Sequence, residues 1–99
     1  MARRAAVHPG EILKTEFLDE LDLSAYALAK ALNVPPNRIT LIINGERAIS
    51  ADTALRLSRF FGNTPEFWMN LQSHYDLAIA RQRSAKTIDR EVAELTATA

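Results

Sequence analysis

The sequence predicts an all-α fold of five helices followed by a C-terminal helical extension. Apolar residues recur three and four positions apart along most of the chain, which places them on one face of a helix. Capping residues and prolines stand where these segments start, and Asn or Gly stands where they end. The β-branched run at residues 39–43 could form a strand, but Pro35-Pro36 and Asn44-Gly45 leave room for only a short element, and the flanking periodicity favours a helix.

The first two helices are expected at residues 9–21 and 24–32. Pro9 suits a first helical turn, and Glu11 complements the positive end of the helix. Ser24 can cap the second helix, and Asn33 tolerates the left-handed backbone that ends it. The predicted apolar faces of the two helices comprise Ile12, Leu13, Phe17, Leu18, Leu21, Leu28, Ala29 and Leu32.

The third helix follows the second after a tight turn. Pro35-Pro36 start it and Asn44-Gly45 end it, since proline fits the first turn of a helix but not its interior. Ile39 and Ile42 are expected to face inward, and Val34 is expected to fill the turn. This order of elements predicts a helix-turn-helix, which offers the N-terminus of its second helix to the major groove of DNA.

The outward face of the third helix and the start of the second form the candidate site. Asn can pair with adenine, Arg with guanine, and Thr or Leu can touch a thymine methyl group. Free backbone N–H groups at the start of the second helix can bind a phosphate. Alternatives stay open: Asn44 could only cap the helix, Tyr26 could pack on a neighbour, Leu41 could be core and Arg38 simply solvated. The predicted DNA-binding residues are Ser24, Tyr26, Asn37, Arg38, Thr40, Leu41, Asn44 and Arg47.

The fourth and fifth helices are expected at about residues 50–62 and 64–82. Ser50 and Thr64 are capping residues, and Gly62 ends the fourth helix. We assign Trp68 to the core, while part of the apolar face of the fifth helix could form a dimer interface. A loosening is expected at residues 84–86, then a helical piece at 87–95 and a frayed end. The core face predicted for the fourth helix is Ala54, Leu55, Leu57, Ser58 and Phe61.

The charges are segregated, although the formal net charge of the chain is zero. Residues 9–22 carry one lysine against five carboxylates, a net charge of −4. Residues 23–60 carry five cations against two carboxylates, a net charge of +3, so the helix-turn-helix segment is locally basic. The chain has no cysteine, which fits a reducing cytoplasm, and no apolar run of the roughly 18 residues that cross a bilayer.

An enzyme is not expected. His8 and His74 lie far apart in the sequence, and nothing resembles a nucleophile beside a base. The three glycines punctuate helices rather than forming a phosphate-binding loop, and the acidic residues at 19–22 are best explained as a solvated face. The sequence therefore predicts no catalytic residue, no cofactor and no metal site.

Several motifs together resemble those of the HigA-type antitoxins, the plasmid-maintenance antidote group of the lambda-repressor-like (XRE) helix-turn-helix class. They are HPGEIL at residues 8–13, NGERAIS at 44–50 and PEFWMNLQ at 65–72. The resemblance implies a five-helix DNA-binding domain over residues 7–82, with residues 83–99 as a partly helical extension. Where many lambda-repressor-like proteins have a phosphate-clamping Gln as the second residue of helix two, this chain has Ala25.

The resemblance also implies a function. It implies a homodimer, binding to double-stranded operator DNA, repression of the protein's own operon, and a cognate RelE-like mRNA-cleaving toxin. Two alternatives stay open: a free-standing transcriptional regulator without a toxin, and a protein-interaction module that has lost DNA binding. The local positive charge favours DNA binding, whereas the zero net charge and Ala25 favour the interaction module.

Overall fold

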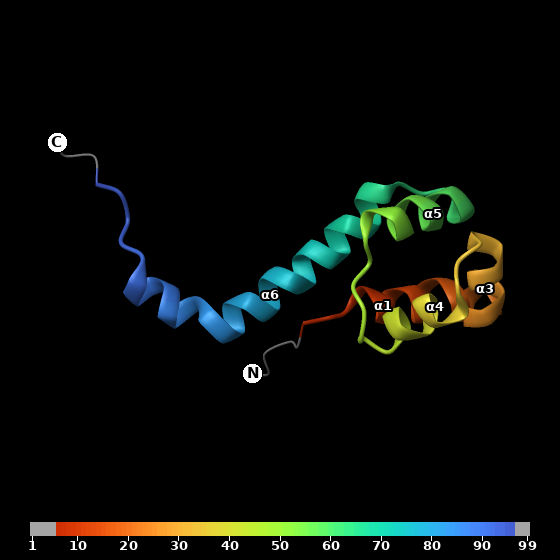
Figure 1. Cartoon of the computed structure of the whole chain (residues 1–99), viewed down its shortest axis with the longest axis horizontal. Helices are drawn as coiled ribbons and strands as arrows, with labels where there is room; N and C mark the ends of the chain where they lie inside the picture. The colour runs from red at the N-terminus through yellow and green to blue at the C-terminus, as the bar shows by residue number, and fades with distance from the viewer. Residues whose placement is uncertain (1–5, 97–99) are drawn as a thin grey trace.

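The computed structural model describes residues 6–96, and within them every regular element is a helix. The first three elements follow one another without a break and form one continuous helical rod. Residues 6–96 therefore form five helical rods (Figure 1). The predicted all-α fold is therefore confirmed. The elements are α1 Pro9–Ile12, η1 Leu13–Leu18, α2 Asp19–Leu21, α3 Ala25–Leu32, α4 Pro36–Ile43, α5 Ala51–Phe61 and α6 Pro65–Glu91.

The first rod covers the predicted residues 9–21 but contains one wide turn. In η1, which is a π-helix, each backbone N–H donates to the carbonyl five residues earlier, as the Asp19 N–H does to the Lys14 carbonyl. The rod begins at His8, whose Nδ1 accepts a hydrogen bond of 2.9 Å from the Gly10 N–H. It ends at Asp22, which takes the left-handed conformation with φ of 53°.

The predicted caps are confirmed at α3, α5 and α6. The hydroxyls of Ser24, Ser50 and Thr64 each accept a hydrogen bond from the backbone N–H three residues on. Asn33 and Gly62 end α3 and α5 in the left-handed conformation, with φ of 60° and 79°. These local signals explain why the helix boundaries could be predicted from the sequence.

The core joins all five rods around Trp68, which is fully buried as predicted. Its ring packs 4.9 Å from that of Phe17, and its Nε1 donates to Asn63 Oδ1 at 2.9 Å. Gln72 is also buried, and its Oε1 accepts a 2.7 Å hydrogen bond from the Ile49 N–H. The buried apolar residues are Leu13, Leu18, Leu28, Ala29, Leu32, Ile39, Ile42, Ile49, Ala54, Leu57 and Trp68.

Two residues assigned to apolar faces are instead exposed. Leu55 is 58% exposed, because it stands about 100° around α5 from Ala54 and so lies off the face that packs inward. Leu21 is equally exposed, at the last turn of the first rod, where no other rod covers it. The other predicted members of the α5 face are buried or half-buried.

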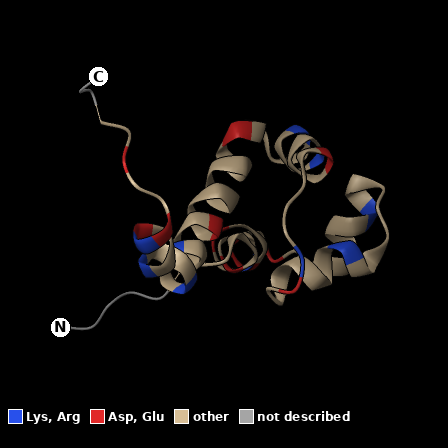
Figure 2. Cartoon of the chain, turned by 60° about the vertical axis from the view of Figure 1, so that its left-hand side comes forward, with Lys and Arg blue, Asp and Glu red and all other residues tan. Residues whose placement is uncertain are grey.

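The loosening predicted at residues 84–86 is wrong, because α6 continues to Glu91. After Pro65 this segment holds neither glycine nor proline, so nothing removes a hydrogen bond or favours a turn. Residues 92–96 are not helical, so the expected piece at 87–95 ends early; the predicted fraying falls largely on residues 97–99, which lie outside the described residues. The end of α6 projects from the bundle, and its last turns carry both signs of charge (Figures 1 and 2).

The His8 cap predicts a pH-dependent stability. Loss of solvation by burial lowers the pKa of His8 below its ordinary value, while Asp76 acts in the opposite direction. The unfolded chain therefore binds the proton more readily than the folded protein. The contribution of His8 to the free energy of unfolding is fully present above about pH 6.5 and is lost as the pH falls through the folded-state pKa. Protonation also removes the lone pair that caps α1. Urea unfolding between pH 7.5 and 5 measures this loss.

The matched control is His8→Asn, which keeps a capping acceptor and removes the titration. We expect the free energy of unfolding of this variant to change less with pH over the same range. An equal change in both proteins would assign the pH dependence to another group.

Candidate nucleic-acid interface

Helices α3 and α4 form the predicted helix-turn-helix. The Val34 N–H bonds the Ala29 carbonyl at 3.0 Å, which closes the turn after Asn33. Pro35 is extended, with φ of −62° and ψ of 145°, and starts α4. Ala29 and Ile39 are fully buried where the helices pack, so the crossing is fixed by a small residue on one helix and a branched one on the other.

Gly10 sets how closely the first rod approaches α4. A Cβ atom on Gly10 would lie 1.7 Å from the Ile42 carbonyl oxygen, so only glycine fits at this crossing. From the sequence we interpreted Gly10 as helix punctuation, because the approach joins segments 32 residues apart. The residue positions the back of the candidate recognition helix.

The outward stripe of α4 consists of Asn37, Thr40 and Asn44, which are exposed and spaced as neighbours on one helix face. The Thr40 hydroxyl donates to the Asn37 carbonyl at 3.4 Å. Asn44 is also the C-cap residue of α4, so its backbone has the capping role that we left open while its side chain faces solvent. Leu41 is half-buried beside this stripe.

Three predicted site residues meet around one hollow. Ser24 from the start of α3 and Thr40 and Asn44 from α4 line a space of about 340 Å³ together with Lys14 of η1. Lys14 forms an ion pair with Asp19 at 2.9 Å. The sequence analysis missed Lys14, because it lies in the segment with a net negative charge, and no local pattern shows that the first rod borders α3 and α4.

Tyr26 and Arg47 lie apart from this hollow. Tyr26 is 65% exposed, so it does not pack on a neighbouring helix as one alternative had it. Arg47 is exposed in the loop after α4. Both side chains are thus free of the core, and their assignment to DNA contacts, like that of the other site residues, stays a prediction.

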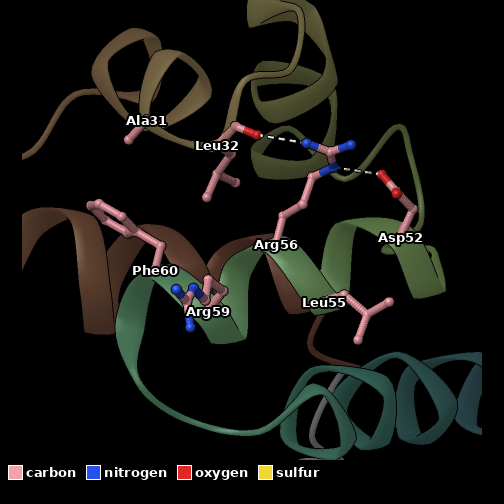
Figure 3. A pocket seen from close by; sticks show the side chains of 7 residues that line it. All are labelled: Ala31, Leu32, Asp52, Leu55, Arg56, Arg59 and Phe60. Carbon is pink, nitrogen blue, oxygen red and sulfur yellow. Dashed lines mark hydrogen bonds and ion pairs between the residues drawn. The ribbon is translucent and has the colours of Figure 1, made fainter.

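Arg38 is turned toward α5 instead of standing on the outward stripe. Its Nη1 donates to Asp52 Oδ2 at 3.0 Å, and its side chain is 24% exposed. The same oxygen accepts a 2.9 Å hydrogen bond from Arg56 Nε, shown in Figure 3. Arg56, and to a lesser degree Arg38, hold the pKa of Asp52 below its usual value. No local pattern indicates this pair, because Arg38 and Asp52 are 14 residues apart.

Other kinds of site find no support in the described part of the chain. Among residues 6–96, no three His, Asp or Glu side chains are grouped so that they could hold a metal ion. No described helix is long and apolar enough to span a membrane. His74 is exposed on α6.

The fold and the exposed face of α4 define a helix-turn-helix protein. The helix-turn-helix family matches residues 15–68. Virulence-associated protein I of Dichelobacter nodosus is 56% identical over 77 residues, covering 78% of this chain and 71% of that protein. The chain belongs to this helix-turn-helix family.

Two solved structures place the chain within the family more narrowly. An addiction module antidote protein of the HigA family from Coxiella burnetii is 52% identical with a TM-score of 0.89, covering 93% of this chain and all of that one. Antitoxin HigA of Pseudomonas aeruginosa, solved with the higBA promoter, is 48% identical with a TM-score of 0.90, covering 92% and 99%. The chain is thus a HigA-type member, which confirms the resemblance inferred from its motifs.

Proposed function

We propose that this protein is a DNA-binding antitoxin that represses its own operon. The observation that carries the proposal is the polar stripe Asn37, Thr40 and Asn44, displayed on α4 beside the capped start of α3. This is the arrangement in which a helix-turn-helix reads base edges. The likeness to antitoxin HigA, solved with its promoter, supports the same role here. The relatives of this chain include an antitoxin and HTH-type transcriptional regulators, so the proposal assigns no catalysis to it.

In this proposal α4 enters the major groove and its surroundings contact the DNA backbone. The N–H groups in the first turn of α3, next to Ser24 and Tyr26, are placed to bind one phosphate. Arg47 would bind phosphates beyond the other end of α4. Since Ala25 replaces the glutamine of many related domains, phosphate binding at α3 relies on the backbone and on Ser24 and Tyr26.

A single domain reads about half a site, so we propose a homodimer through α6 on a palindromic operator. Its half-sites would lie roughly 34–36 Å apart. Exposed apolar side chains on and after this helix, among them Leu77, Ile88 and Val92, support the interface. In this proposal residues 7–82 are the DNA-binding domain and residues 83–99 an extension of it.

We further propose a cognate RelE-like mRNA-cleaving toxin that the protein neutralises in the cytoplasm. The names of the HigA-family relatives support an antitoxin, although they do not name the toxin. Co-expression with a small basic protein encoded next to this gene tests the point: relief of growth arrest supports it. Absence of any such adjacent reading frame would favour a free-standing regulator.

The DNA-binding proposal is tested by fluorescence anisotropy across a salt series. The probes are a labelled duplex from upstream of the gene and a scrambled duplex of the same composition. We expect tight binding to the first duplex only, with a negative slope of log affinity against log salt. Weak binding that ignores sequence would indicate an interaction module that has lost DNA binding.

Arg47→Ala and Arg38→Ala should have different effects on these two duplexes. Loss of Arg47, an exposed phosphate contact, should weaken binding to both duplexes alike and reduce the salt slope by about 0.9. Loss of Arg38, which Asp52 holds against α5, should change binding to either duplex little. Equal losses from both substitutions on both duplexes would contradict these roles.

A further inference from the structure

Asp52 joins three helices of the candidate interface through two guanidinium groups. Its Oδ2 accepts from Arg38 Nη1 in the first turn of α4 at 3.0 Å and from Arg56 Nε on α5 at 2.9 Å. Arg56 Nη1 also donates to the Leu32 carbonyl at the end of α3, at 2.9 Å (Figure 3). We call Asp52, Arg38 and Arg56 the Asp52 clamp.

The clamp holds Arg38 in a position that it would not keep alone. The Arg38 side chain is mostly buried, and its Nε has no hydrogen-bond partner among the described residues. A charge withdrawn from water in this way depends on its carboxylate partner. Without Asp52, the long side chain would turn outward into solvent. Arg38 directly follows Asn37 of the outward stripe, so a freed guanidinium could reach a DNA phosphate.

We propose that Asp52 is a positioning residue that limits phosphate binding beside α4 by holding Arg38 against α5. The inference rests on the proposed function, in which α4 binds DNA. A guanidinium paired with a carboxylate adds little attraction for phosphates, which are present on every sequence. Asp52 therefore keeps non-specific affinity low and leaves base reading to the outward stripe.

Asp52→Asn tests the proposal on the operator and scrambled duplexes. The freed Arg38 should add a phosphate contact, so we expect tighter binding to scrambled DNA with a salt slope steeper by about 0.9. Because phosphates are present on every sequence, binding to the operator should tighten as well, and the ratio of operator to scrambled affinity should stay unchanged. Combining Asp52→Asn with Arg38→Ala should abolish the gain on scrambled DNA. Circular dichroism confirms that each variant is folded.

Glu46→Gln is the matched control for charge. Glu46 is exposed in the loop after α4 and makes no ion pair among the described residues. Glu46→Gln removes the same charge as Asp52→Asn but frees no guanidinium, so we expect it to strengthen binding to both duplexes without adding a full phosphate contact to the salt slope. If Asp52→Asn behaves like Glu46→Gln, or if its gain survives in the combination with Arg38→Ala, the proposal is overturned.

A measurement without DNA separates this inference from the proposed function. Hydrogen exchange of the Arg38 Nε–H, followed by NMR, should be slow in the wild type and fast in Asp52→Asn, because the atom is buried only while the clamp holds. Exchange in the wild type as fast as that of the exposed Arg47 would overturn the proposal. Failure of the wild type to distinguish the two duplexes would instead refute the proposed function, and the exchange rates would still decide whether Asp52 holds Arg38.

Discussion

Gly10→Ala is expected to destabilise the fold by about 3 kcal/mol or more, at the upper end of overpacking costs. A Cβ at this position would lie 1.7 Å from the Ile42 oxygen and 2.5 Å from its carbonyl carbon. Both atoms belong to the backbone of α4, so no side chain can move aside and the two helices must separate. In an ordinary helix the same change would stabilise by about 1 kcal/mol, so the sign of the effect is itself informative.

Urea unfolding measures this loss, and Gly62→Ala provides the comparison. Gly62 has φ of 79° and nothing within 4 Å of its Cβ position, so alanine there costs only the left-handed backbone, about 1–2 kcal/mol. A Gly10→Ala variant as stable as Gly62→Ala would show that the first rod does not press on α4. Because Gly10 contacts the back of α4, operator binding should also be lost in the folded fraction that remains.

Trp68→Ala should cost about 3–5 kcal/mol, the usual range for truncating a buried aromatic residue. The ring is fully buried and lies 4.9 Å from Phe17 and 5.0 Å from Phe67. Truncation would open a cavity between the first rod and α6 and would leave the Asn63 side chain without its indole donor. The free energy of unfolding in urea, followed by circular dichroism, measures the effect.

Met69→Ala is the matched control on the next position of α6. Its side chain lies at the surface, so we expect a change within about 0.5 kcal/mol. If both substitutions cost the same, Trp68 does not anchor α6 to the bundle. Trp68→Phe, which keeps most of the apolar volume and removes the N–H, should fall between the two.

The sequence predicted the candidate site only in part. The exposed positions on α4 could be predicted from the helical spacing of Ile39 and Ile42. Once these two residues are assigned to the buried face, the other positions of the helix face solvent. Arg38 followed the same logic and was assigned to the outward face, yet the structure pairs it with Asp52. Lys14 was not considered, although it lines the same hollow as Ser24. Both differences involve contacts between elements that are separate in the sequence.

The sequence by itself determined the helices, their caps and the family. Ser24, Asn33, Ser50 and Gly62 act through hydrogen bonds and backbone angles within four residues of themselves, so their effect is present in any window that contains them. The tertiary structure decided the exposure of Leu55, the close approach at Gly10 and the clamp at Asp52. Partners and clearances of this kind depend on how helices cross, and no local pattern specifies the crossing.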